Sequence, residues 1–361
     1  MSNIFGQLNL NDTDRVFNAT TGQEAVYEII EQYNARYNQE LNAAKAVFVG
    51  DMSDIHKLRY KLPANGRLQR RGRSSTPANR KNSGYWDVAF PLEDFGDTVA
   101  GDDVTLGYMT ALELSNHVTG VMTRDKSTVR HEILRALFNN AQDTFSDPLW
   151  GNLSIEPLAN GDGVVYPPVL GSDTEATDDH YLVSGYASTD ISDTNDPFAT
   201  LVEELIEHFG ESVGGDNIVT FINQGQLAKV AALADYEAVP DNFIRSGDNT
   251  NIPQRLPNVP GRIVGRMTGG DNATWVSVWR WIPANYMLTI HLEEAQPIQE
   301  RVDPADTGLG NGLVLVSESG TKPVNQWFWR HRFGFGASNR LNGAVMQLKA
   351  SGSYDVPSAY S

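Results

Sequence analysis

The sequence predicts an α+β fold, and three features support this prediction. Two long stretches, one from Thr21 and one between Leu106 and Phe145, carry apolar residues at helical spacing. From Trp275 onward, short apolar runs with strand-like alternation replace this pattern. Helical and strand segments are interleaved without the regular alternation of a doubly wound parallel sheet, which favours the α+β class.

The composition describes a globular chain without disulfide or thiolate chemistry. The chain has 361 residues, 40% of them hydrophobic, and no cysteine. No signal peptide and no membrane-spanning run is visible, so we expect a soluble protein made in the cytosol. The formal net charge, 28 basic minus 45 acidic residues or −17, disfavours general binding to DNA or anionic membranes.

The first long helix is predicted to begin near Thr21. Thr21 and Glu24 have the spacing of a capping box, in which each side chain satisfies a backbone N–H of the first turn. The apolar residues that follow at helical spacing are Val26, Ile29, Ile30, Tyr33, Tyr37 and Leu41. This pattern predicts one amphipathic helix.

A dense basic segment follows this helix. Between Ile55 and Trp86 lie nine of the 28 basic residues and no acidic residue. The flanking stretches "KLRYKL" and "GYWDVAFPL" alternate like strands, which predicts a long hairpin with a basic tip. We call residues 66–81, "GRLQRRGRSSTPANRK", the basic loop.

Three interpretations of the basic loop compete. A nucleic-acid arm is opposed by the rest of the chain, since 19 remaining bases against 45 acids leave −26. A solvated, disordered loop is the plainest interpretation. The third is a positive hook that binds the acidic surface of another copy of the chain, which suits head-to-tail assembly into rings or shells.

The middle of the chain alternates helical and strand patterns. Residues 106–145 form the longest helical stretch, with Ser127 as a cap of its second half and Gly120 as an expected break or kink. Residues 173–196 carry seven acids and no base. A helix is predicted from Asp196-Pro197 and another over "QGQLAKVAALADY". The predicted strands are "WVSVWRWI", "NYMLTIHL", "GLVLVSE" and "NGAVMQLK".

No catalytic motif is present, so the sequence predicts a protein that is not an enzyme. "HEILR" lacks the second histidine of a zinc-protease motif, and "GLGNGL" follows a turn instead of a strand. "DISDTND" offers oxygens to a calcium ion but lacks the glycine and final glutamate of an EF-hand loop. His291 is expected on the polar surface of its strand. We therefore predict no metal and no cofactor.

The C-terminal stretch "WFWRHRFGFGASNRLNGAVMQLKASGSYDVP", above all residues 332–336 and 339–343, resembles the closing strands of tailed-bacteriophage major capsid proteins with the Hong Kong 97-type fold. "RVDPADTGLGNGLVLVSE" just upstream is similar to a subset of that family. The resemblance implies five parts. These are an N-terminal arm (1–55), an extended β-hairpin loop (56–98), a peripheral domain that begins with a long spine helix (99–179), an axial domain (180–290) and C-terminal peripheral strands (291–361).

The resemblance also implies a function in the virion. The chain would be a structural protein that self-assembles in the host cytoplasm, through hexamers and pentamers, into an icosahedral shell around the double-stranded DNA of a tailed phage (Caudoviricetes). It would bind DNA without sequence specificity and bind no membrane. Because the chain has no room for a scaffolding domain, either a separate scaffolding protein or prior cleavage of such a domain is implied. A portal and a decoration protein are implied as further partners.

Two alternatives remain open at this point. One is an encapsulin-type nanocompartment shell, which has the same fold. The other, from a different class, is a β-rich carbohydrate-binding protein that uses Trp275, Trp279 and Trp281 as sugar platforms, although tryptophans at period two more often pack in a core or interface.

The candidate intersubunit contacts are ionic. Arginine forks pair with carboxylates in a bidentate manner, so the hook is assigned to arginines of the basic loop. The hook residues are Arg67, Arg70, Arg71, Arg73 and Arg80. The expected acidic partners are Glu93, Asp94 and Asp97, or the acids of residues 173–196. Some relatives join a loop lysine to a neighbour's asparagine; Lys57, Lys61, Lys81, Asn339 and Asn342 lie in suitable regions, but no motif fixes a pair, and we predict no crosslink.

Overall fold

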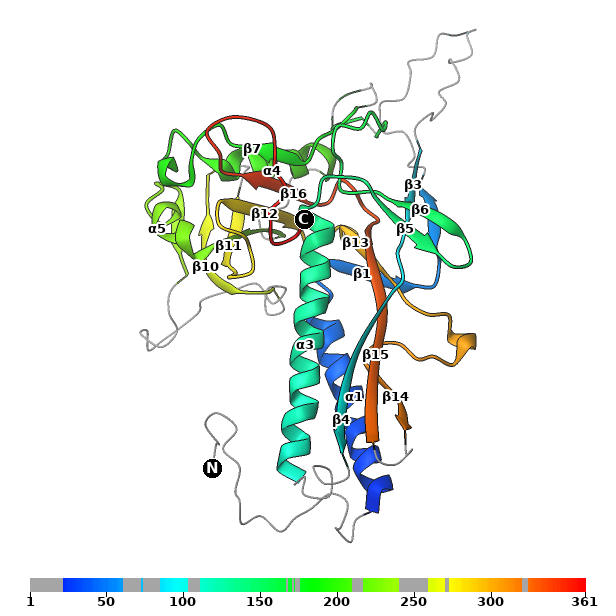
Figure 1. The fold of residues 1–361 in the computed structure, drawn as a ribbon. Helices are drawn as coiled ribbons and strands as arrows, with labels where there is room; N and C mark the ends of the chain where they lie inside the picture. The colour runs from blue at the N-terminus through cyan, green and yellow to red at the C-terminus, as the bar shows by residue number, and fades with distance from the viewer. Residues whose placement is uncertain are drawn as a thin grey trace. The chain divides into compact units, whose positions relative to one another are not determined.

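The computed structural model has the mixed α+β architecture that the sequence predicts (Figure 1). The residues that the structure describes are 22–60, 73, 85–102, 111–166, 168–170, 172, 176–209, 217–239, 259–269, 273–319 and 324–361. The chain divides into two compact units, and each unit is built from three separate segments. The first comprises Met1–Lys45, Leu92–Glu132 and Arg301–Gly334, and the second comprises Ala46–Pro91, Ile133–Glu300 and Phe335–Ser361.

The first unit packs helices against an antiparallel sheet. Helix α1 (Gly22–Lys45) and helix α3 (Ala111–Phe138) confirm the two long helices predicted from apolar spacing. Strand β4 (Glu93–Asp102) pairs with the long strand β15 (Val324–Ala337), and β14 (Val314–Ser319) pairs with the other edge of β15. The core of this unit consists of Ile30, Val99, Leu114, Val118, Val121, Leu313, Trp327 and Trp329.

The side chains of β15 alternate between this core and the surface. Trp327 and Trp329 are buried, whereas Phe328 between them is 37% exposed. Alternation with period two is the consequence of the pleat of a strand. The sequence "WFW" therefore anchors the strand with its first and third residues and leaves the second on the outer face.

Helix α3 contradicts two predictions. The break expected at Gly120 and the helix cap expected at Ser127 are both wrong, because α3 continues through these residues without interruption. A Cβ atom at position 120 would meet only the Arg124 guanidinium, at 3.5 Å. A single glycine inside a helix costs about 1 kcal/mol of stability relative to alanine. This cost is too small to end a helix that has several turns on both sides of the glycine.

The second unit contains a mixed seven-stranded sheet in the order β7-β16-β12-β8-β11-β10-β9. Its strands are β7 (Tyr181–Val183), β8 (Ile218–Ile222), β9 (Tyr236–Ala238), β10 (Arg262–Met267), β11 (Thr274–Val278), β12 (Tyr286–His291) and β16 (Ala344–Gln347). Helix α4 (Pro197–Phe209) buries Leu201, Val202 and Leu205 in the core cluster that these strands share.

The helix predicted at Asp196-Pro197 is confirmed, and the one after Asn223 is much shorter than expected. The Phe198 N–H donates to Asp196 Oδ1 at 2.9 Å, which caps α4. After Asn223 come only η3 (Gln224–Gln226) and α5 (Leu227–Val230). Strand β9 follows soon afterwards, so pairing with β10 replaces the further helical turns that the local pattern favours.

Smaller strand pairs complete the second unit. Strand β2 (Lys57–Tyr60) pairs antiparallel with β3 (Trp86–Ala89), as predicted for the flanks of the basic loop. Strand β5 (Asp143–Asp147) forms a hairpin with β6 (Gly151–Ile155). Strand β1 (Val49–Ser53) pairs with β13 (Ile298–Arg301). The remaining short helices are η1 (Ser188–Asp190) and η5 (Ala305–Thr307).

Strand β12 corrects the expected position of His291. We expected this residue on a polar surface, but all six residues of β12 are buried and His291 is 6% exposed. His291 lies opposite Ile218 of β8 in the sheet, and the ring of Phe209 on α4 lies 6.2 Å from its imidazole, so α4 covers this face of the strand. Two polar groups on this strand have internal partners: the hydroxyls of Thr289 and Thr220 are 2.9 Å apart, and the His291 backbone N–H donates to Asn342 Oδ1.

Burial makes His291 a contributor to the pH dependence of stability. Burial lowers the pKa of His291 below its ordinary value of 6.5. As the pH falls below about 6.5, the unfolded state binds a proton that the folded state still refuses, so the free energy of unfolding decreases. We expect His291→Gln to flatten this decrease below about pH 6.5. Urea unfolding at several pH values would measure it, with His117→Gln controlling for the loss of one histidine; equal slopes in wild type and the His291 variant would contradict the prediction.

Candidate functional site

The predicted acidic partners lie on β4, and the structure distinguishes among them. Asp97 accepts a hydrogen bond from Arg124 Nε at 2.5 Å, so its carboxylate already has a cationic partner in the same chain. The side chain of Asp94 is 60% exposed, with Arg332 Nε at 3.9 Å. Arg332 itself donates to the Asp303 carboxylate at 2.6 Å. Glu93 faces Phe333 in the register of β15. Asp94 is thus the better exposed of the two aspartates.

Asp97 lines a pocket of the first unit, together with the buried pair of Asp125 and His331. The pocket has a volume of about 240 Å³ and includes Asp97, Arg124, Asp125 and His331 in its lining. His331 Nδ1 lies 2.8 Å from Asp125 Oδ1, and the Tyr37 hydroxyl donates to Asp125 Oδ2 at 2.9 Å. Burial raises the pKa of Tyr37, so its hydroxyl remains a donor. This network ties α1, α3 and β15 together and had no signature in the sequence.

Of the hook residues, only Arg73 belongs to the described residues, where it is exposed. Arg67, Arg70, Arg71 and Arg80 lie outside the described residues. The strands that lead to the basic loop carry an ion cluster of their own. Asp87 on β3 accepts from Arg59 Nε at 2.6 Å and lies 3.2 Å from Lys57 Nζ. The hydrogen bond from Arg59 lowers the pKa of Asp87 to about 2, although slight burial opposes the shift.

The asparagines considered for a crosslink have internal partners in the structure. Asn342 is fully buried and donates to the carbonyl oxygens of His291 and Ala295. Asn339 also donates to the Ala295 carbonyl, at 2.8 Å. Lys61 and Lys81 lie outside the described residues, and Lys57 is paired with Asp87. The absence of a crosslink remains a prediction.

The arginine of the motif "NRLNG" joins two segments of the second unit through buried hydrogen bonds. The Arg340 side chain is fully buried, and its Nε donates to the Pro157 carbonyl at 2.6 Å. Its Nη2 donates to the Leu158 carbonyl and to Asp162 Oδ2. A long charged side chain is buried here because backbone carbonyls and a carboxylate surround it.

The motif "RFGFG" requires glycine at its last position. A Cβ at Gly336 would lie 2.8 Å from Phe90 Cδ1 and 2.9 Å from the Ala89 carbonyl oxygen. Backbone cannot give way as a flexible side chain can, so we expect Gly336→Ala to lower the free energy of unfolding by about 1–3 kcal/mol. Gly120→Ala, in the open interior of α3, is the matched control and is expected to be neutral or stabilising by up to about 1 kcal/mol. Equal urea midpoints for the two variants would refute the close-contact argument.

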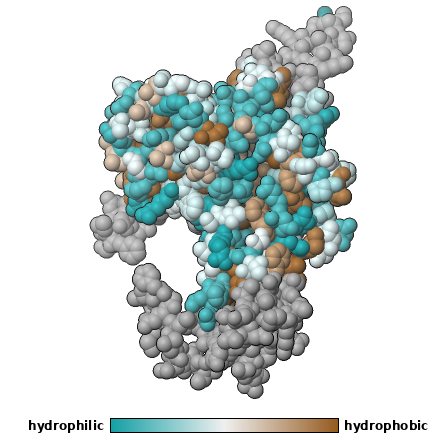
Figure 2. Space-filling model, in the orientation of Figure 1, coloured by the Kyte–Doolittle hydropathy of each residue, from teal (hydrophilic) through white to brown (hydrophobic). Residues whose placement is uncertain are grey.

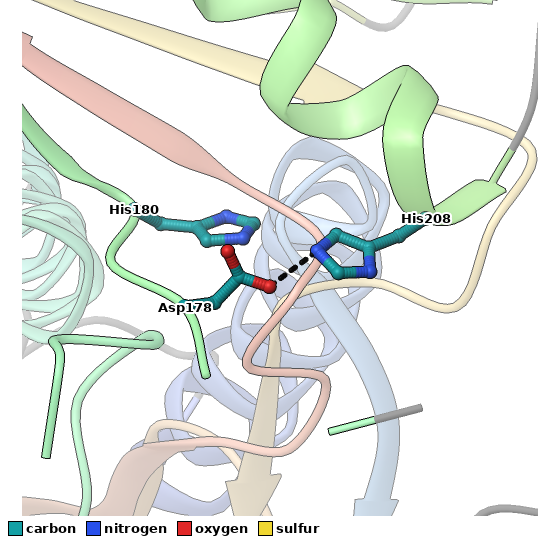
Figure 3. Close-up of side chains that lie close together, drawn as sticks. All are labelled: Asp178, His180 and His208. Carbon is teal, nitrogen blue, oxygen red and sulfur yellow. Dashed lines mark ion pairs between the residues drawn. The ribbon is translucent and has the colours of Figure 1, made fainter. Parts of the chain in front are cut away.

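A buried cluster in the second unit was not found by sequence reasoning. Asp178 and His180 lie just before β7, and His208 lies in the last turn of α4; all three point toward one another (Figure 3). The His208 Nε2 is 2.6 Å from Asp178 Oδ2, and the two imidazole rings are 5.8 Å apart. The acids Glu204 and Glu207 of α4 adjoin Asp178. A sequence search by fixed spacing cannot see this cluster, because it joins two separate segments.

Burial and neighbouring charges shift the pKa values of His180, Asp178 and Glu204 in this cluster. Burial lowers the pKa of His180 to about 4, so the imidazole is neutral near pH 7. Burial alone would raise the pKa of Asp178, but the hydrogen bond and the ionic contact with His208 outweigh it and lower this pKa. Burial, together with the negative charges of Glu207 and Asp178, raises the pKa of Glu204 to about 8. Glu204 is therefore largely protonated near pH 7.

The acids of "DISDTND" have local structural functions. Asp193 Oδ1 accepts from the Ala234 N–H at 2.8 Å, and Asp196 caps α4. Asn195 Nδ2 donates to the Asp190 carbonyl. These contacts explain the composition of the segment through turn and cap geometry.

Comparison with known proteins gives a fold. No family model and no curated protein matches the chain. A solved structure from Mycobacterium phage Patience is 19% identical, with a TM-score of 0.65, and the match covers 96% of this chain and 93% of that chain. The structure described as the asymmetric unit of the bacteriophage PhiM1 mature capsid is 8% identical, with a TM-score of 0.52, and covers 86% and 87% of the two chains.

These matches extend over most of both chains, so the chain has the fold of a phage capsid protein. The resemblance read from the C-terminal stretch is confirmed at the level of fold. Among the described residues, no helix is both long and apolar enough to span a bilayer.

Proposed function

We propose that the chain is a major capsid protein of a tailed bacteriophage, with the Hong Kong 97-type fold. It self-assembles through hexamers and pentamers into an icosahedral shell that encloses double-stranded DNA. The observation that carries the proposal is the fold match to a mature phage capsid subunit over most of both chains. The longer match to the Mycobacterium phage structure supports it.

In this proposal the described elements take defined places. Helix α3 is the spine helix of the peripheral domain, and β2 and β3 are the base of the extended loop, whose tip is the basic loop. The N-terminal arm (1–55) includes α1, and the axial domain (180–290) includes α4 and strands β7 to β12. Residues 291–361 return the chain to the peripheral domain.

The surface of the second unit offers apolar contacts to a neighbouring subunit. Leu149 and Trp150, between β5 and β6, are 84% and 57% exposed. Large exposed apolar side chains on a hairpin tip are typical of protein interfaces. On the face shown in Figure 2, hydrophobic residues are scattered among hydrophilic ones. Such a surface suits many modest contacts, which a closed shell combines into a durable assembly.

The net charge fits a container for DNA. A chain of −17 repels phosphate, so packed DNA does not adhere to the wall and can leave on demand. The proposed partners are further copies of the chain, a separate scaffolding protein, a portal and a decoration protein. The mature location is the virion, after assembly in the host cytoplasm, and no enzymatic step is assigned to the chain.

The carbohydrate-binding alternative loses its structural basis. Trp275 is 7% exposed, and the Trp279 ring stacks on Phe48 with ring centroids 5.6 Å apart. Trp281 is 38% exposed and lies beyond the end of β11. A platform for sugar rings needs exposed aromatic faces on one surface, and these three tryptophans do not provide one.

The test of the proposal is electron microscopy of the purified chain at low and high salt, with mass from light scattering on the same samples. Closed shells or capsomer rings that loosen as the salt concentration rises are the expected result. A monomer at every salt and protein concentration would refute the proposal. Shells loaded with a protein cargo and lacking any packaged DNA in vivo would point instead to an encapsulin-type compartment.

A further inference from the structure

The cluster of Asp178, His180 and His208 has the geometry of a metal site. Each residue offers one ligand atom, and these atoms all lie within 4.8 Å of one another. They come from two elements of the second unit, the segment that enters β7 and the last turn of α4 (Figure 3). The cluster is buried, since the side chains of His208 and Asp178 are only 3% and 10% exposed.

His180 provides the independent observation that points to a ligand. This residue is 0% exposed, and its Nδ1 lies 2.8 Å from the Gly343 carbonyl oxygen. A carbonyl only accepts, so Nδ1 carries the proton and donates, and Nε2 of the neutral ring carries the lone pair. Among the described residues, Nε2 has no hydrogen-bond partner, yet it is directed into the cluster. A buried polar atom without a partner is costly and calls for an explanation.

We propose that Asp178, His180 and His208 bind a divalent transition-metal ion, and that Zn²⁺ is the ion that fits their chemistry. Two imidazoles and one carboxylate are a common zinc donor set, whereas Mg²⁺ and Ca²⁺ prefer oxygen ligands alone. Bonds of about 2.0–2.1 Å in a tetrahedral site place ligand atoms about 3.3 Å apart. The three ligand atoms of this cluster lie within 4.8 Å of one another, which is close to that spacing.

The surroundings of the cluster match those of metal-bound histidines. A histidine ligand usually donates its second ring N–H to a carbonyl or carboxylate, which fixes the tautomer, and His180 does this with Gly343. Glu207 Oε1 lies 3.5 Å from His208 Nε2 and is the nearest candidate for the fourth position. Asp178, Glu204 and Glu207 also offer carboxylate oxygens within 4.8 Å of one another, so further oxygen ligands lie beside the two histidines.

Metal binding here would fasten the end of α4 to the segment that enters β7. The inference depends only on the second unit, so it stands whether or not the chain forms shells. The first measurement is the metal content of the full-length chain after dialysis against Zn²⁺ and then metal-free buffer, by inductively coupled plasma mass spectrometry. We expect about one zinc per chain. A parallel sample with Co²⁺ is expected to show the intense visible bands of tetrahedral cobalt.

Variants separate this site from adventitious histidine binding. Asp178→Asn and His208→Gln keep the approximate shape of the side chains and are expected to reduce bound zinc at least tenfold. His117→Gln removes an exposed histidine of α3 and is the matched control, expected to retain full zinc. Thermal unfolding of the wild type and the control should shift upward in Zn²⁺ but not in Mg²⁺.

The inference is overturned if the wild-type chain retains less than a tenth of an equivalent of zinc. It is also overturned if the Asp178 and His208 variants, folded by circular dichroism, bind as much zinc as the wild type. The wild-type stoichiometry and the cobalt spectrum do not depend on any variant, so the test holds even if a substitution prevents folding.

Discussion

Arg340→Ala is expected to lower the free energy of unfolding by about 3–5 kcal/mol, because it removes a fully buried side chain and the donors of two backbone carbonyls and a partly exposed carboxylate. The guanidinium is fully buried and donates to the Pro157 and Leu158 carbonyls and to Asp162. Alanine would leave these acceptors without donors and would open a cavity where the side chain had been. The measurement is urea unfolding of dissociated subunits, followed by circular dichroism.

Two further variants test the reason for this loss. Arg280→Ala removes an exposed arginine and is expected to change stability by less than about 0.5 kcal/mol. Arg340→Lys keeps the charge but cannot reproduce the planar set of guanidinium donors. We therefore expect it to lower the free energy of unfolding less than Arg340→Ala does, but still below the wild-type value. If Arg340→Ala lowered the free energy of unfolding no more than Arg280→Ala does, the contacts of the buried arginine would not stabilise the second unit.

The elements that the sequence predicts well are those whose signals are local. The apolar spacing of α1 and α3 is set by the helix period, and the cap at Asp196 involves neighbouring residues only. The β2–β3 pair was visible because alternating strands flank a polar turn segment. In each case the information lies within a few turns or strand residues.

The failures depend on distant parts of the chain. The alternation in β12 indicated one exposed face, but α4 packs on that face through Phe209 and buries His291. The helix expected after Asn223 gives way to β9, because pairing with β10 outweighs a modest local helical preference. At Gly120 the sequence predicts a break that the structure does not have. The helical turns on both sides of this glycine keep α3 continuous.

Candidate sites were harder to predict than elements, for the same reason. The cluster of Asp178, His180 and His208 joins two segments that no spacing motif connects. The acids of β4 were recognised as a charged group, but the sequence cannot show that Asp97 has Arg124 as a partner in its own chain. Ionic partners are set by three-dimensional proximity, so charge composition identifies candidates without pairing them.

Reversing the charge of the basic loop is expected to abolish assembly of the chain into shells. Replacing Arg67, Arg70, Arg71, Arg73 and Arg80 by glutamate changes the net charge by −10, from −17 to −27. If the basic loop binds an acidic surface of a neighbouring subunit, every such contact becomes repulsive and no shells or capsomers should form at low salt. Electron microscopy and light scattering would detect this loss, and circular dichroism would show that the subunit remains folded.

Replacing the same five arginines by lysine is the matched control. Lysine keeps the charge but loses the bidentate geometry, so assembly should persist at low salt and fail at a lower salt concentration than in wild type. If the glutamate variant assembled as well as the lysine variant, the basic loop would be a solvated loop without a function in assembly.

A charge swap on β4 then tests the partner of the basic loop. Asp94 is the candidate to change first, because its side chain is 60% exposed, whereas Asp97 is held by Arg124 in its own chain. Asp94→Lys alone should weaken assembly, and in combination with the glutamate loop it should restore part of what each change removes, since like charges have become opposite again. Additive losses would exclude Asp94 as the partner and direct the same test to the acids of residues 173–196. Asp97→Asn should have the smaller effect on assembly, because the carboxylate that it removes already binds a cation within the subunit.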